Sequence, residues 1–299
     1  MLAHAGRGVF SNVVKCKDQH RNLDVALKFI RSNPMMRTAA KKEVQLLAKL
    51  NEHDKDDKRN IVRLYRTFQY RNHYCLVFEM LWNNLRYALK KYGGNGKGLS
   101  MGAVWSYSRQ LFIALRFLKK FDVVHADLKP DNILINNSYK VLKLADLGSA
   151  VYSGECDVTS YFVSRFYRAP EVILGMAYGI EIDMWSAACT IFEIFCGKIL
   201  FAGKSNNDMI RLHMDVQGAM PSNMLNEGKF TDKHFNIATG AFLWQQTDKD
   251  KNIVGTTELY DLKPTKDITM RIISRSEGDE YKTKKAQQLA DLLKSILIK

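Results

Sequence analysis

The sequence predicts an α+β fold in which a small, mainly β part is followed by a larger, mainly helical part. Up to about residue 82, the apolar residues fall in short runs rich in β-branched and aromatic side chains, as in strands. Beyond that point, apolar residues recur at spacings of three and four, as on one face of a helix. With 299 residues, 46% of them hydrophobic, the chain is long enough to bury a core.

The first part predicts four strands and one helix. The strand candidates are the runs VFSNVVKCK, DVALKFI, NIVRLYRTF and HYCLVFEM. The helix candidate is TAAKKEVQLLAKL, which lies between the second and third runs. The polar run NEHDKDDKRN follows this helix, and we expect it to be a solvated loop.

The second part predicts long helices. Five apolar residues mark one face of a helix that ends just before VVHADLKP. They are Val104, Tyr107, Leu111, Leu115 and Leu118. The stretch EIDMWSAACTIFEIFCG is apolar nearly all round, so its helix should be central in the fold.

Cysteine spacing and hydropathy exclude several classes of protein. The five cysteines form no CxxC pair, which argues against both a zinc site and a disulfide framework. The chain begins with no apolar signal core and contains no run long enough to cross a bilayer. We therefore expect a protein that is neither secreted nor embedded in a membrane.

The net charge is strongly positive, with 45 Lys and Arg against 31 Asp and Glu. Such a charge favours phosphate-rich surroundings, although solvated lysine faces would explain it equally well. Because no alternation of aromatic and basic residues is apparent, we do not expect direct nucleic-acid binding.

The stretch HADLKPDNILI places three polar groups close together, on Asp127, Lys129 and Asn132. An ion pair would need only two of these groups. A turn at the surface would not be followed at once by the apolar run of residues 133–135. The turn is therefore expected to be anchored in the fold, with its polar side chains directed at a common site.

Further residues of the chain could contribute to the same site. In KLADLGS, an apolar strand delivers Asp146 to a turn. Upstream, GRGVFSNV places Gly6 and Gly8 where backbone N–H groups can approach phosphates, and Lys28 and Glu43 follow. Each signal is weak alone, since a GxG turn is usually a hairpin and a strand lysine is usually solvated. Their order and spacing are informative together.

This order resembles that of the protein kinases: Gly-rich loop, strand lysine, helix glutamate, catalytic loop, metal-binding aspartate and then Ala-Pro-Glu. The resemblance covers essentially the whole chain. It implies the two-lobed protein-kinase fold, with an N-lobe at residues 1–81 and a C-lobe at residues 82–299. It also implies ATP and Mg²⁺ as cofactors.

The resemblance implies a role for each polar residue. Lys28 is expected to grip the α- and β-phosphates of ATP while Glu43 orients it. Asp127 is expected to be the catalytic base, and Lys129 to neutralise the phosphoryl group in transfer. Two magnesium ligands are implied, Asn132 and Asp146. This agrees with the loose transition state of phosphoryl transfer, in which a protein mainly positions groups and supplies charge.

An adenine site is implied as well. Phe78 is expected to be the gatekeeper, and the backbone of Glu79 and Leu81 to meet adenine. Three apolar residues should enclose the ring, namely Val13, Ala26 and Leu134. The alternative for these side chains is ordinary core packing. Gly6 and Gly8 complete the implied ATP-binding set.

Finer motifs resemble the CMGC group of kinases. In SRFYRAPEVILG, Arg168 directly precedes Ala-Pro-Glu, and an insert follows at about residues 204–285. The stretches HADLKPDNIL, SYFVSRFYRAPE, MDVQGAMP and LKPTKD resemble the family of the spliceosomal pre-mRNA-processing factor four kinase. This resemblance implies a monomeric, nuclear serine/threonine kinase that acts on splicing proteins, with Ala126 as part of the family pattern.

The activation segment carries a regulatory expectation. Tyr161 lies four residues before Arg165 and seven before Arg168. In CMGC relatives, arginines at these places bind a phosphotyrosine, so we expect Tyr161 to be phosphorylated by the kinase itself. The alternative is a tyrosine that only packs beneath the peptide groove.

Both ends of the sequence depart from the family pattern. Only five residues precede Gly6, so the first strand is expected to be short. The chain stops at ADLLKSILIK, before the segment that supplies an arginine to Glu171 in the family. We therefore expect Glu171 to lack that partner.

Two other functions remain as alternatives. One is a catalytically weak, pseudokinase-like scaffold, against which the presence of Lys28, Asp127, Asn132 and Asp146 argues. The other is a ribonucleoprotein subunit that contacts RNA without relevant catalysis, which only the charge favours.

Overall fold

The structure, a computed structural model, describes residues 3–7, 11–94, 96–155, 163–250, 252–276 and 279–298. The chain divides into two compact units that interleave along the sequence. The first unit comprises Met1–Lys91, Trp105–His125 and Pro130–Ala150. The second comprises Tyr92–Val104, Ala126–Lys129 and Val151–Lys299. This division does not test the lobe boundary at residue 82, which stays a prediction.

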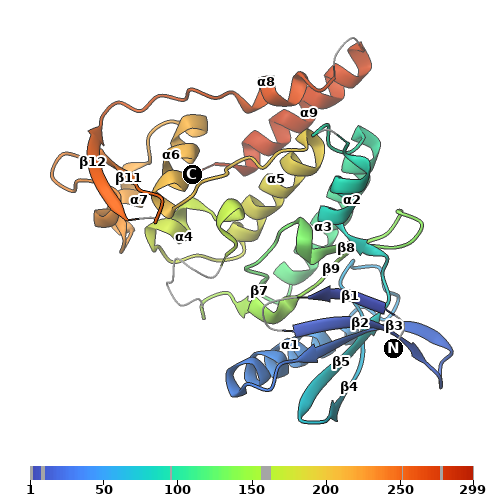
Figure 1. Cartoon of the computed structure of the whole chain (residues 1–299). Coiled ribbons are helices and arrows are strands. Elements are labelled where there is room, and N and C mark those ends of the chain that lie inside the picture. Colours follow the sequence, from blue (N-terminus) through green and yellow to red (C-terminus); the bar gives the residue numbers. More distant parts are fainter. Residues whose placement is uncertain are drawn as a thin grey trace. The chain divides into compact units, whose positions relative to one another are not determined.

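The first unit contains a five-stranded antiparallel sheet of order β1-β2-β3-β5-β4 (Figure 1). Its strands are β1 (Ala3–Arg7), β2 (Ser11–Asp18), β3 (Leu23–Ile30), β4 (Leu64–Tyr70) and β5 (His73–Glu79). Lys28 lies on the central strand β3, opposite Val13 of β2 and Leu76 of β5. The sheet therefore fixes the backbone of Lys28 on both sides.

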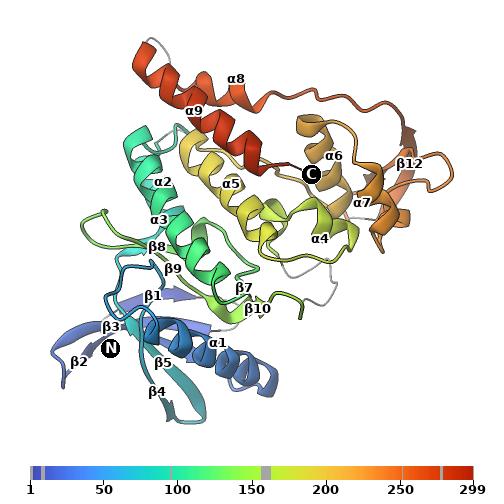
Figure 2. The same cartoon turned by 180° about the vertical axis from the view of Figure 1, so that it is seen from behind.

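Helix α1 (Pro34–Glu52) packs on this sheet, as Figure 2 shows from behind. It begins four residues earlier than the apolar pattern predicts, because the side chain of Asn33 accepts hydrogen bonds from the amides of Met35 and Met36. Proline at the first helical position also favours this start. Its buried face consists of Ala40, Glu43, Leu46, Leu47 and Leu50.

A small second sheet carries the polar turns that the sequence singles out. Its order is β6-β8-β9, with β6 (Asn83–Asn84), β8 (Ile133–Ile135) and β9 (Leu142–Leu144). Helix α2 (Leu85–Tyr92) follows β6, and α3 (Met101–Lys119) precedes β7 (Val123–Val124). The five apolar residues predicted for one face of α3 are all buried.

The second unit is mainly helical and is built around α5 (Glu181–Cys196). Nearly every residue of α5 is buried, as its all-round apolar sequence predicts, and α8 and α9 pack against it. The helices are α4 (Pro170–Leu174), α6 (Asn206–Gln217), α7 (Ser222–Glu227), α8 (Ile268–Ile273) and α9 (Glu280–Ile296). The strands are β10 (Val151–Tyr152) and the hairpin of β11 (Phe242–Thr247) and β12 (Ile253–Leu259). The predicted α+β fold class is confirmed.

In the part of the chain that the structure describes, no helix is both long and apolar enough to cross a membrane.

Candidate active site

Three elements of the first unit bring Lys28, Glu43 and Asp146 together. The ammonium of Lys28 donates to both carboxylate oxygens of Glu43 at 2.9 Å and to Oδ1 of Asp146 at 3.0 Å. Burial lowers the pKa of Lys28, but the two carboxylates outweigh burial and raise the pKa above its ordinary value. Lys28 is therefore a permanent cation that two acids hold in place.

Asp146 lies where β9 gives way to a short turn. Its backbone has a φ of 60°, in the left-handed region, and its side chain is half exposed. The amide of Ala145 donates to the carbonyl of Asn132 at 2.9 Å, so the chain segments that carry Asn132 and Asp146 lie side by side.

The donors in these two segments suit a hard cation. A carboxylate and an amide oxygen are ligands that Mg²⁺ prefers, and Mg²⁺ usually keeps several waters and phosphate oxygens besides. The described residues contain no cluster of three or more His, Cys, Asp or Glu that would hold a metal by itself. The carboxylate of Asp146 and the amide oxygen of Asn132 fit a metal whose other ligands are phosphate and water.

In the second unit, Asp127, Lys129 and Ser164 form a closed triangle of hydrogen bonds. Lys129 donates to Oδ2 of Asp127 at 2.7 Å and to the hydroxyl of Ser164 at 2.8 Å. That hydroxyl donates to Oδ1 of Asp127 at 2.6 Å. The sequence analysis missed Ser164, because 37 residues separate it from Asp127, although it stands in the VSRFYRAPE motif.

The residue before Asp127 explains the geometry of this turn. Ala126 has a φ of 63°, which is rare for a residue other than glycine. Its amide donates to the carboxylate of Asp183 on α5 at 3.0 Å, and Asp183 is buried. This bond holds the strained turn, so alanine does not prevent Asp127 from taking its position.

His125 has a structural place. It is completely buried, and its Nε2 lies 3.0 Å from the carbonyl oxygen of Ala145. Since a carbonyl only accepts, Nε2 carries the proton. His125 therefore ties the catalytic-loop segment to the strand that precedes Asp146.

Of the residues predicted to surround adenine, Val13, Ala26 and Phe78 lie on neighbouring strands of the five-stranded sheet, and Leu134 lies on β8. Ala26 pairs with Phe78 across β3 and β5, and Gly6 pairs with Val13 across β1 and β2. Phe78 and Leu81 are buried, whereas Val13, Ala26 and Leu134 are partly exposed. Gly8 lies outside the described residues.

Comparisons with known proteins agree with this geometry. A family model of the protein kinase domain matches residues 1–299. The chain belongs to the protein kinase domain family.

Individual relatives define the branch of this kinase family. Serine/threonine-protein kinase prp4 of Schizosaccharomyces pombe is 42% identical over 297 residues, 99% of this chain and 61% of that protein. Serine/threonine-protein kinase prpf4B of Dictyostelium discoideum is 42% identical over 98% of this chain and 36% of the relative. Homeodomain-interacting protein kinase 2 of Mus musculus is 36% identical over 99% of the chain and 26% of its own length. The predicted resemblance is confirmed, and the chain spans less than two thirds of these relatives.

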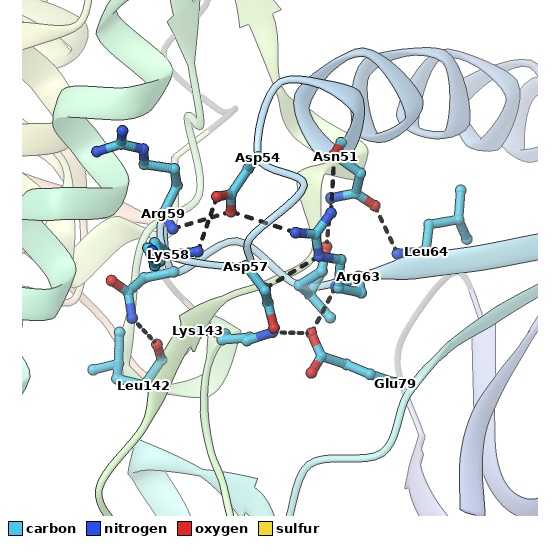
Figure 3. Close-up of polar contacts among 12 residues, drawn as sticks. Asn51, Asp54, Asp57, Lys58, Arg59, Arg63, Leu64, Glu79, Leu142 and Lys143 are labelled. Carbon is cyan, nitrogen blue, oxygen red and sulfur yellow. Dashed lines mark hydrogen bonds and ion pairs between the residues drawn. The ribbon is translucent and has the colours of Figure 1, made fainter. Parts of the chain in front are cut away.

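This kinase chain contains a charged network that the sequence analysis did not predict (Figure 3). Lys143 on β9 is buried, and its ammonium lies 2.6 Å from Oε1 of Glu79 and 2.6 Å from Oδ2 of Asp57. Arg63 donates through Nε to Asp57 at 3.1 Å. The backbone amide of Arg63 donates to Glu79 at 2.7 Å, and the amide of Glu79 returns a bond to the carbonyl of Arg63.

The prediction of a solvated loop after α1 is therefore wrong in part. Asp54 is buried, and its carboxylate accepts from the amides of Lys58 and Arg59. The buried ammonium of Lys143 needs carboxylate partners, and Asp57 of this loop supplies one. A lone lysine in the apolar strand sequence VLKLAD was the signal for this network.

The same network determines the environment of the Glu79 carboxylate. The backbone of Glu79 is the part predicted to meet adenine. Burial raises the pKa of Glu79, although Lys143 opposes this effect. Its side chain and its backbone amide are both engaged within the first unit.

The structure places the activation-segment arginines as follows. Arg168 is buried and donates to the carbonyl of Val163 and to Oδ1 of Asn206, whereas Arg165 donates to the carbonyl of Lys204. Tyr161 lies outside the described residues, so its phosphorylation stays a prediction. Burial raises the pKa of Glu171, and the nearby charge of Glu181 adds to this effect.

Proposed function

We propose that this chain is a serine/threonine protein kinase that transfers the γ-phosphoryl group of ATP to splicing proteins. The observation that supports it most is the presence of each charged group that the transfer needs, held by a specific partner: Lys28 by Glu43, and Asp127 by Lys129. The named relatives at 42% identity are serine/threonine-protein kinases.

The residues of the chain divide the work of this reaction. ATP supplies the phosphoryl group, and a bound Mg²⁺ would neutralise part of the charge on its phosphates. Asn132 and Asp146 would hold the metal, and Lys28 would hold the phosphates. Asp127 orients the substrate hydroxyl and accepts its proton, while Lys129 offers positive charge to the phosphoryl oxygens.

Ser164 acts in this scheme through Asp127. By donating to Oδ1, the Ser164 hydroxyl fixes the rotation of the carboxylate about its side-chain bonds. A fixed carboxylate can meet the incoming hydroxyl without reorganising, which is a main source of catalytic rate.

A pseudokinase scaffold is not favoured, because a scaffold has no need of these groups. The splicing substrates and a nuclear location rest on the sequence resemblance to the pre-mRNA-processing factor four kinases. We also propose, from the sequence motif alone, that the kinase phosphorylates its own Tyr161. We expect mass spectrometry of the purified protein to find this phosphate.

The proposal is tested by incubating the kinase with labelled ATP, Mg²⁺ and proteins of a splicing extract, followed by mapping of the phosphorylated residues. We expect phosphoserine and phosphothreonine on splicing proteins, and none above background with Asp127→Asn. Label confined to tyrosine, or spread equally over proteins unrelated to splicing, would contradict the proposed substrate class.

A further inference from the structure

Three aromatic side chains outside the proposed active site converge on the surface of the first unit. The ring centroid of Trp82 lies 5.4 Å from that of Tyr87 and 4.9 Å from that of Tyr139, both nearly at right angles to it. Tyr87 and Tyr139 are 44% and 41% exposed. Both cartoon views show the β8–β9 turn, which carries Tyr139, close to α2 (Figures 1 and 2).

Lysines accompany these rings. The ammonium of Lys91 lies 5.2 Å from the centre of the Trp82 ring, and Lys90 beside it is exposed. Lys140 follows Tyr139 and is also exposed. Residues 82–91 and 135–140 contain no Asp or Glu, so both segments carry only positive charge. We do not count Arg86, because it pairs with Asp131 at 3.0 Å.

The backbone at Tyr139 adds an independent observation. Its φ is 60°, a conformation that Gly and Asn adopt readily but that is strained for a bulky residue. The hydroxyl of Tyr107 donates to the carbonyl of Tyr139 at 2.9 Å, and Asn136 caps the same turn. The fold thus holds an exposed aromatic ring where a small residue would cost less, which points to a use for that ring.

We propose that this aromatic–lysine patch (Trp82, Tyr87, Lys90, Lys91, Tyr139 and Lys140) binds single-stranded RNA. Exposed rings accept unpaired bases by stacking, whatever the base sequence, because every base has a flat face. The lysines neutralise the phosphates that connect those bases and release counterions. An acidic peptide would satisfy the lysines but would leave the rings without stacking partners.

The choice of RNA over DNA rests on the proposed splicing role, whereas binding itself does not depend on kinase activity. The proposal also revises the expectation from sequence that the chain does not bind nucleic acid. That expectation rested on the lack of aromatic–basic alternation along the chain, and folding brings together the rings of Trp82 and Tyr139, which are 57 residues apart.

The test measures fluorescence anisotropy of a short labelled oligouridine titrated with the purified chain, at low and at physiological salt. The test variant is Tyr87→Ala/Lys91→Ala. The chain offers a matched control on α9, where Tyr281 and Lys285 have the same spacing and their ring and ammonium lie 5.7 Å apart. The control Tyr281→Ala/Lys285→Ala removes the same atoms and the same charge.

We expect the test variant to bind oligouridine at least about fivefold more weakly, since each lost stack costs that much or more. The salt dependence should also become shallower, by about 0.7 in the logarithmic slope for the lost lysine. The control variant should bind like the wild type. Tyr139→Asn, which suits the left-handed turn and so preserves the fold, should weaken binding without a change in salt slope.

Four results would overturn the proposal or its choice of RNA. Equal weakening in the test and control variants would show binding by net charge alone. Failure of the wild type to bind oligouridine at physiological salt would show that the patch does not take RNA. If a polyglutamate peptide binds through the patch while the oligonucleotides do not, its partner is a protein. If an oligodeoxyuridine of the same length binds more tightly than oligouridine, the patch does not prefer RNA.

Discussion

The contacts of Ser164 go beyond packing. Its hydroxyl donates a hydrogen bond to Asp127 and accepts one from the ammonium of Lys129. We predict that Ser164→Ala lowers kcat by about ten- to a hundredfold, because the carboxylate loses its fixed orientation. KM for ATP should change little. Steady-state kinetics of peptide phosphorylation measure both constants.

Ser164→Thr serves as the control for this prediction, because it keeps the hydroxyl. It should restore most of the rate. If the alanine and threonine variants lose activity equally, the hydroxyl is not what matters and Ser164 acts only through packing.

His234 provides a test of stability at the residue scale. It is buried, and its Nδ1 lies 3.2 Å from the amide nitrogen of Asn207, which donates to it. Burial, with help from the charge of Lys233, lowers the pKa of His234 to about 4. The folded state therefore prefers neutral histidine, whereas the unfolded chain binds a proton near pH 6.5.

The sign of this effect follows from proton linkage. As the pH falls from about 6.5 toward about 4, the unfolded state gains a proton that the folded state refuses, so stability declines by up to about 1.4 kcal/mol per pH unit. We predict that His234→Gln, which cannot titrate, shows a weaker loss over this range. Denaturant unfolding at several pH values gives the difference. Parallel pH profiles for the two proteins would rule out His234 as the cause.

At the scale of elements, the Lys143 network connects β9, the end of β5 and the loop after α1 (Figure 3). We predict that Lys143→Met lowers the free energy of unfolding by about 3–5 kcal/mol, because it leaves the largely buried carboxylate of Glu79 without its cation. Lys143→Arg should lose less, since the charge remains. Chemical denaturation measures all three proteins.

A second lysine of the chain provides the control. Lys266 lies 2.7 Å from Asp215, but this pair is at the surface. Lys266→Met should therefore cost no more than about 1 kcal/mol. Equal losses for Lys143→Met and Lys266→Met would mean that burial does not strengthen the network.

The elements also show where sequence reasoning succeeds. The helix α1, the apolar face of α3 and the central position of α5 follow from local periodicity, which a sequence displays directly. The start of α1 at Pro34 required the cap by Asn33, a side chain-to-backbone bond that periodicity does not reveal. The ion pair of Asp57 depends on Lys143, 86 residues beyond it, and no local pattern carries that information.

The candidate site divides in the same way. Lys28, Glu43 and Asp146 could be named from the spacing of motifs, and the structure places the ammonium of Lys28 within 3.0 Å of a carboxylate oxygen of each acid. The role of Ser164 and the hydrogen bonds between Arg63 and Glu79 could not be predicted from the sequence, because only the fold brings these partners together.

At the scale of the whole molecule, the net charge of +14 bears on the choice of substrate. Opposite potentials speed encounter, whereas like charges oppose it. We predict that this kinase phosphorylates neutral or acidic Ser/Thr-Pro peptides faster than Arg-Ser repeats at low salt. The measurement compares the initial rates of phosphorylation of the two peptides at low salt. Faster transfer to the repeat would show that a local acidic surface outweighs the net charge.

The central claim is that the chain transfers phosphate with Lys28 and Asp146 at the phosphates and the metal. The most direct measurement is transfer of labelled phosphate from ATP to a protein substrate by the purified chain, beside Lys28→Ala and Asp146→Ala. The account predicts transfer by the wild type and none above background by either variant. Both variants should still unfold cooperatively, with a loss of stability in Lys28→Ala because the buried carboxylate of Glu43 loses its cation. Transfer retained by Asp146→Ala, or absent from the wild type with ATP and Mg²⁺, would contradict the account.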